Sequence, residues 1–142
     1  MNESDPVDIG LSHVALPVAD VDVSIAFYER FAGMSVVHRR VDDDVAVAWI
    51  SDHTRPFIVV LLGTTERDAV ATLGGWAHLG VGCASRDEVD RRLADAAAAG
   101  FRVLPAVDAG PPVGYYGIIK DPDGHNLEVA YGQHVEAVVV GT

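Results

Sequence analysis

Three residues with metal-binding side chains stand at matching places in a repeated sequence. His13 opens the segment HVALPVAD and His78 opens the segment HLGVGCAS, and the two segments align without a gap. Each leads into a helix-like stretch that stops at a glycine, and each copy later ends in an apolar strand. Only the second of these strands carries a glutamate, Glu128. Because imidazole and carboxylate groups bind divalent metals, the pattern indicates a metal site built on an internal repeat.

The two copies predict the same order of elements. Residues 9–62 are expected to form a strand, a helix and three further strands, and residues 77–132 repeat that order. In the first copy, Asp20 or Asp22 can cap the helix and Gly33 can end it in the left-handed conformation. Each copy is therefore predicted to be a βαβββ module.

The second helix carries its own start signal. Ser85 is followed three residues later by Glu88, which is the spacing of a capping box. Residues 63–76 are predicted to connect the modules, and residues 133–142 form an apolar tail that could cover a sheet edge or a dimer contact. One module alone would expose the open face of a curved sheet, so we expect residues 1–142 to fold as a single domain.

Composition excludes several functions. The chain has 142 residues, 49% of them hydrophobic, and a formal net charge of -11, which repels the phosphate backbone of nucleic acids but suits a cationic small molecule. Its one cysteine, Cys83, cannot form an intrachain disulfide. The acidic N-terminus is unlike a signal peptide, and no apolar stretch is long enough to cross a bilayer. We therefore expect a cytoplasmic protein with neither nucleic-acid nor membrane partners.

Three motifs relate the chain to a known group of proteins. HV stands on the first predicted strand, FYERFAGM on the first helix and DPDGHNLEV before the last strand. Over residues 9–132 the chain resembles the vicinal oxygen chelate superfamily, which holds glyoxalase I, extradiol dioxygenases, fosfomycin-resistance enzymes, methylmalonyl-CoA epimerase and bleomycin-binding proteins. The resemblance implies an α+β fold in which two tandem βαβββ modules form a cupped mixed β-sheet, and it implies a homodimer.

The same resemblance implies a set of metal ligands. The positions carry over as His13, His78 and Glu128, two imidazoles and a carboxylate that leave coordination positions open for a substrate. Such a set favours Fe(II) and tolerates Mn(II), Zn(II) or Ni(II). The metal would act as a Lewis acid on a small molecule that chelates it through vicinal oxygens.

The two modules differ at the position of the glutamate. In the first module Val60 stands where Glu128 stands in the second, and a register error of one residue would substitute Val59 or Leu61, both apolar. Glyoxalase I and the epimerase carry Glu or Gln at this place. A valine can neither ligate a metal nor accept a proton. A three-ligand site favours a dioxygenase-like enzyme, with a glyoxalase I-like lyase or isomerase as the alternative.

Comparison within the superfamily also suggests which residues act beside the metal. Two-domain extradiol enzymes carry a tyrosine near the position of Ile118, and here Tyr115 or Tyr116 could take that catalytic role. Fosfomycin enzymes use a threonine where this chain has Ala15, and they need several cations, whereas Lys120 is the only lysine. Phosphonate chemistry is therefore disfavoured.

Large apolar side chains are predicted to wall a pocket for an aromatic or aliphatic substrate. These pocket residues are Trp49, Phe57, Val60, Trp76, Tyr115, Tyr116 and Ile118.

A rival from another class is a non-catalytic drug-binding protein similar to the bleomycin-resistance proteins, which are also acidic. The presence of all three ligand types argues against that class. In the second module, residues 121–124 are predicted to form a structural type I turn, and His125 beside it is expected to be exposed.

Overall fold

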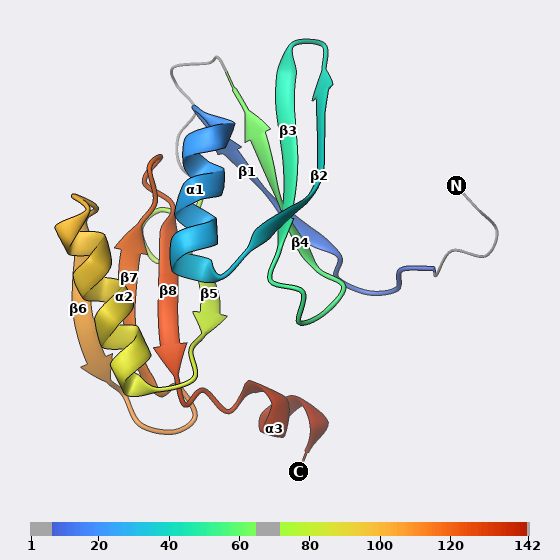
Figure 1. The fold of residues 1–142 in the computed structure, drawn as a ribbon. Helices are drawn as coiled ribbons and strands as arrows, with labels where there is room; N and C mark the ends of the chain where they lie inside the picture. Colours follow the sequence, from blue (N-terminus) through green and yellow to red (C-terminus); the bar gives the residue numbers. More distant parts are fainter. Residues whose placement is uncertain (1–6, 65–71, 142) are drawn as a thin grey trace. The chain divides into compact units, whose positions relative to one another are not determined.

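The chain forms two compact units, which we call unit 1 (Met1–Ala69) and unit 2 (Val70–Thr142). The structure is a computed structural model and describes residues 7–64 and 72–141 (Figure 1). Each unit contains one four-stranded mixed sheet and one long helix. The α+β class and the two βαβββ modules predicted from the sequence are confirmed.

Unit 1 follows the predicted order of strand, helix and three strands. Its sheet has the order β1-β4-β3-β2, with β4 parallel to β1 and the remaining neighbours antiparallel. The first and last strands of the module are therefore neighbours in the sheet. The elements are β1 His13–Val18, α1 Val21–Ala32, β2 Ser35–Asp42, β3 Val45–Ser51 and β4 Ile58–Gly63.

Unit 2 repeats this topology strand for strand. Its sheet has the order β5-β8-β7-β6, and β8 runs parallel to β5. The elements are β5 Leu79–Gly82, α2 Arg86–Ala98, β6 Val103–Asp108, β7 Tyr115–Lys120 and β8 Asn126–Tyr131, followed by a short helix, α3 Val135–Val140. The sequence pattern did not predict α3, which lies in the apolar tail.

Side-chain caps start both long helices where the sequence indicated. Asp20 Oδ1 accepts hydrogen bonds from the backbone N–H groups of Asp22 (3.0 Å) and Val23 (3.2 Å), so Asp20 is the cap of α1. Gly33 ends that helix with a φ of 65°. At α2, the N–H of Glu88 donates to Ser85 Oγ at 3.1 Å. The Glu88 carboxylate accepts from the backbone of Ala84 rather than of Ser85.

Each sheet buries one face against its own long helix. In unit 1 the side chains of Leu16, Ile50 and Leu61 are fully buried, together with Tyr28 of α1. Successive side chains of a strand point to opposite faces, so His13, Ala15 and the other odd-numbered positions of β1 lie on the face away from the helix. The same alternation holds in unit 2, where buried Leu127 and Val129 flank Glu128 on β8.

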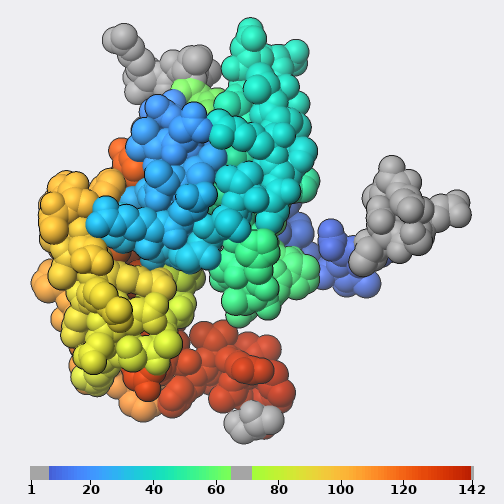
Figure 2. Space-filling view, in the orientation of Figure 1, coloured from blue at the N-terminus to red at the C-terminus, as the bar shows by residue number. Residues whose placement is uncertain are grey.

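The apolar tail stays exposed on unit 2. Helix α3 extends beyond the end of β8 (Figures 1 and 2), and its valines are exposed. Val138 is 68% exposed and Val139 is 78% exposed. Among the described residues, no helix combines the length and the apolar composition that crossing a bilayer requires.

The cap of α1 provides a test of the fold. Replacing Asp20 by alanine leaves two helical N–H groups without an acceptor, which should lower the free energy of unfolding by about 0.5–2 kcal/mol in urea denaturation. Asp95→Ala is the matched control, because Asp95 is an exposed aspartate in α2 and its carboxylate caps no helix. Equal stability of the two variants would contradict the capping role.

Candidate metal site and ligand pocket

Two of the predicted ligands face each other within unit 2. Strand pairing sets Leu79 opposite Leu127 and Gly80 opposite Glu128, which places His78 at the start of the same pair of strands. The distance between His78 Nε2 and Glu128 Oε1 is 3.9 Å. Metal–nitrogen and metal–oxygen bonds are each about 2.0–2.2 Å long, so one cation could contact both atoms.

The hydrogen bonding of His78 leaves the correct nitrogen available for a metal. His78 Nδ1 lies 2.9 Å from the backbone oxygen of Trp76. A carbonyl oxygen only accepts, so Nδ1 carries the proton and Nε2 keeps its lone pair on the side of Glu128. Metal-binding histidines usually donate their second ring nitrogen to a carbonyl or carboxylate in this way.

Glu128 is a largely buried carboxylate. Its side chain is 10% exposed, and Gln133 Nε2 donates to its Oε2 at 3.2 Å. Among the described residues it forms no ion pair with a lysine or arginine. A buried carboxylate is costly unless a cation neutralises it, so this arrangement fits a divalent metal. Gly80 leaves room for the Glu128 carboxylate, because a Cβ at position 80 would lie 3.3 Å from Oε2.

The strand that carries Glu128 also positions the segment before His78. Asn126 Nδ2 donates to the backbone oxygens of Gly75 and Ala77, both at 2.9 Å. The backbone N–H of Asn126 donates to Leu73 O at 2.7 Å. Asn126 is 3% exposed, so the donor of the two side-chain bonds is buried. Sequence reasoning missed this role, although Asn126 lies in the DPDGHNLEV motif.

The prediction that His125 is exposed is wrong. Its side chain is fully buried, and Nδ1 accepts a hydrogen bond from the backbone of Leu73 at 3.3 Å. Asp121 Oδ1 accepts from the backbone N–H groups of Asp123 and His125, both at 2.8 Å, which stabilises the turn. The turn therefore directs His125 inward, where it holds the segment that leads to His78.

In unit 1 the strand register identifies the counterpart of Glu128. Ala15 pairs with Val60 across β1 and β4, as Gly80 pairs with Glu128 across β5 and β8. Val60 is 8% exposed and lies on the His13 side of its sheet. The position equivalent to Glu128 is therefore Val60 itself, and not Val59 or Leu61.

A pocket of about 410 Å³ lies beside His13 in unit 1. The hydroxyl of Ser12 lies 2.8 Å from His13 Nδ1, which leaves Nε2 as the nitrogen that could ligate. Trp49, Phe57 and Val60, three of the predicted pocket residues, line it. The full lining is Asp8, Ser12, His13, Val37, Trp49, Ser51, Arg55, Pro56, Phe57, Ile58 and Val60.

The remaining predicted pocket residues belong to unit 2. Ile118 pairs with Glu128 and Tyr116 pairs with Ala130, so both share the Glu128 face of the sheet. Tyr115 points to the other face, where its hydroxyl donates to Asp90 of α2 and the guanidinium of Arg86 lies 4.7 Å from its ring centroid.

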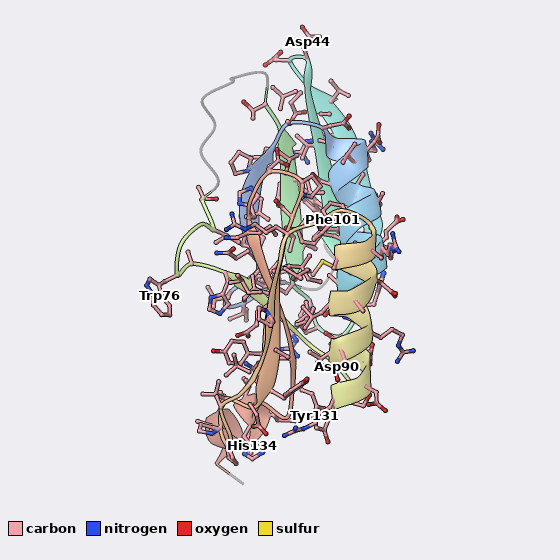
Figure 3. The ribbon with its side chains drawn as sticks, turned by 90° about the vertical axis from the view of Figure 1, so that its left-hand side faces the viewer. Asp44, Trp76, Asp90, Phe101, Tyr131 and His134 are labelled. Carbon is pink, nitrogen blue, oxygen red and sulfur yellow. The ribbon has the colours of Figure 1, made fainter. Side chains whose placement is uncertain are left out.

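Trp76 projects into solvent. It is 98% exposed, and Figure 3 shows its side chain pointing outward from unit 2. Strand pairing separates the two candidate tyrosines, because Tyr116 shares the sheet face of Glu128 whereas Tyr115 points to the other face.

No complete metal centre appears within the parts of the chain that the structure describes. Over residues 7–64 and 72–141, no three His, Cys, Asp or Glu side chains converge closely enough to hold a metal ion. His78 and Glu128 are the two predicted ligands that belong to one unit, and His13 belongs to the other.

Comparison with known proteins identifies the family. The chain matches the Glyoxalase/Bleomycin resistance protein/Dioxygenase superfamily over residues 10–129. With its paired βαβββ modules, the protein belongs to this superfamily. It is 38% identical over 126 residues to the uncharacterized protein PA2024 of Pseudomonas aeruginosa, covering 87% of this chain and 89% of that one.

Two further proteins are similar to this chain, one in sequence and one in fold. A probable lactoylglutathione lyase of Vibrio parahaemolyticus is 27% identical over 139 residues, covering 91% of this chain and 95% of the relative. The fold is similar to that of the fosfomycin resistance protein FosX from Listeria monocytogenes in complex with Mn(II) and a dihydroxypropylphosphonic acid. That structure has a TM-score of 0.71 and 18% identity, and the alignment covers 93% of this chain and 99% of FosX.

Removal of the Asn126 side chain tests how His78 is positioned. Asn126→Ala leaves two carbonyls of the 75–77 segment without their donor, so we expect the free energy of unfolding to fall by about 1–3 kcal/mol in urea denaturation. Asp95→Ala is the matched control, because it removes a side chain of similar size at an exposed position of the same unit and should change stability by less than about 0.5 kcal/mol. Similar losses in both variants would refute the positioning role.

Proposed function

We propose that this protein is a divalent-metal-dependent enzyme that acts on a small molecule with two neighbouring oxygens. His13, His78 and Glu128 are the proposed ligands. The largely buried carboxylate of Glu128, which pairs with no lysine or arginine among the described residues, and the Nε2 lone pair of His78 support the metal. Fe(II) is the first candidate, and Mn(II), Zn(II) or Ni(II) would also suit these ligands.

The observation that carries the reaction type is the valine at position 60. Its pairing with Ala15 makes it the counterpart of Glu128, and an aliphatic side chain supplies neither a fourth ligand nor a base. Three protein ligands leave positions open for substrate and a second reactant, which favours a dioxygenase-like reaction.

Different residues would then hold the metal, bind the substrate and transfer a proton. A bound divalent cation supplies Lewis acidity toward two chelating oxygens of the substrate. Trp49, Phe57 and Val60 bind the apolar body of the substrate and exclude water from it. Tyr116, on the Glu128 face, is the candidate to hold or deliver a proton at a substrate oxygen.

The alternative is a lyase or isomerase similar to glyoxalase I. The relative described as a probable lactoylglutathione lyase favours it. This chemistry moves a proton between carbons and therefore needs a base on each side of the reacting centre or a mobile one. Val60 cannot serve, so a lyase here would depend on Glu128 or Tyr116 for that step.

Metal analysis is the primary test of the proposal. Protein purified anaerobically without a histidine tag should contain about one metal ion per chain by elemental analysis, and Glu128→Ala and His13→Ala should lose it. Because loss of supporting partners alone weakens metal binding by about 10–100-fold, loss of a ligand should exceed that range. His53→Asn is the control, since asparagine tolerates the positive φ of 62° at that exposed histidine.

The identity of the metal directs the activity assays. If the metal is iron, we expect oxygen uptake with catechol-type substrates. If it is nickel or zinc, we expect isomerisation of hemithioacetals. If neither the wild-type protein nor the variants bind metal, the enzyme proposal fails and the non-catalytic drug-binding class replaces it.

Gln133 allows a finer test of the same site. Its amide fixes one oxygen of Glu128 and leaves the other facing His78, so Gln133→Ala should weaken Mn(II) binding by about 10–100-fold in a calorimetric titration. Gln133→Glu should differ from Gln133→Ala in its Mn(II) affinity, because a second carboxylate repels Glu128 in the metal-free protein. Unchanged affinity in Gln133→Ala would show that the amide does not orient the ligand.

A further inference from the structure

The pocket in unit 1 contains an arginine without an ion-pair partner. Arg55 lines the pocket and forms no ion pair within 4.0 Å among the described residues. By contrast, Arg39 pairs with Asp22 at 2.7 Å and Arg40 pairs with Asp42 at 2.8 Å. The formal net charge of the chain is -11, so this guanidinium is a local positive charge on an acidic protein.

Local structure keeps Arg55 at the pocket. The residue lies in the loop between β3 and β4, where the backbone N–H of Phe57 donates to Arg55 O at 2.8 Å and turns the chain. The charge of Arg55 interacts with that of Asp52, whose carboxylate is already hydrogen-bonded by Thr54 at 2.6 and 3.0 Å. Burial alone would raise the pKa of Asp52, but the Thr54 bonds and the charge of Arg55 leave it below its usual value.

The other groups in the pocket restrict what Arg55 could bind. Trp49, Phe57 and Val60 form apolar walls that suit an aromatic or aliphatic body. Asp8 also lines the pocket and places one negative charge there. The single guanidinium can pair with one carboxylate of a ligand, whereas a dianionic phosphonate would bring two negative charges to that one cation and meet stronger repulsion from Asp8.

We infer that the pocket recognises a monocarboxylate with an apolar body, with the carboxylate on the guanidinium of Arg55 and the body against Trp49 and Phe57. This inference rests on the proposed function, because it names the substrate class of the same pocket. It differs from the expectation drawn from net charge alone, which suits cationic ligands. A planar guanidinium donates two parallel hydrogen bonds to a carboxylate, and a neutral amide or a cation cannot accept them in the same way.

The test measures binding to metal-free protein, so it is independent of the metal analysis. Trp49 fluorescence reports the pocket once the exposed Trp76 is replaced in a Trp76→Phe background, which leaves one tryptophan of the chain's two. Benzoate, benzamide, benzamidine and phenylphosphonate serve as probes of equal ring size. We expect saturable binding of benzoate, roughly tenfold or more tighter than that of the other three.

Two arginine variants locate the source of that preference. Arg55→Gln should bind benzoate and benzamide equally, because the charged donor is gone. Arg39→Gln removes the same charge from the same unit at a residue paired with Asp22, and it should keep the preference for benzoate. Both arginines are exposed, so neither substitution should prevent folding.

Several results would overturn the inference. These are equal affinity for benzoate and benzamide, preference for benzamidine or phenylphosphonate, retention of the benzoate preference in Arg55→Gln, or no saturable change with any probe. A protein that holds metal but shows one of these results refutes the carboxylate class alone. A protein that prefers benzoate but holds no metal supports the carboxylate class and refutes the enzyme.

Discussion

The parallel pairing of the first and last strands in each unit determines where every candidate group lies. In a βαβββ module these two strands are the most distant in sequence, yet they are neighbours in the sheet. Their register sets Gly80 beside Glu128 in unit 2 and Ala15 beside Val60 in unit 1. A shift of one residue would turn Glu128 into the face that packs against α2, where Leu127 and Val129 now lie, and a charged group would be buried there without a partner.

The sequence predicted the features that depend on local chemistry. Asp20, Ser85 and Gly33 act at helix ends because the groups that they satisfy lie within a few residues. The equivalence of Val60 and Glu128 was predictable to within one residue, because both stand in the last apolar strand of their copy, and the strand pairing then selects Val60 over Val59 and Leu61.

The features that depend on distant contacts could not be predicted in the same way. His125 follows a turn of polar residues, which suggests exposure, and only the return of residues 73–77 past β8 buries it. Trp76 has the side chain of a core residue, but no neighbour in its unit covers it. Gln133 contacts Glu128 across a bend at Gly132 that no periodic pattern indicates.

The bonds between residues 73–77 and the side chains of His125 and Asn126 also link the two proposed ligands of unit 2 to its folding. They join positions about 50 residues apart and close most of unit 2 into one loop. Ordering such a loop has an entropic cost that is recovered only when β8 is in place beside β5. His78 and Glu128 come together only when β5 and β8 are paired, so a partly unfolded unit 2 would not bring these two proposed ligands together. Under the proposed function, a chain that ends before β8 would therefore lack the pair of ligands in unit 2.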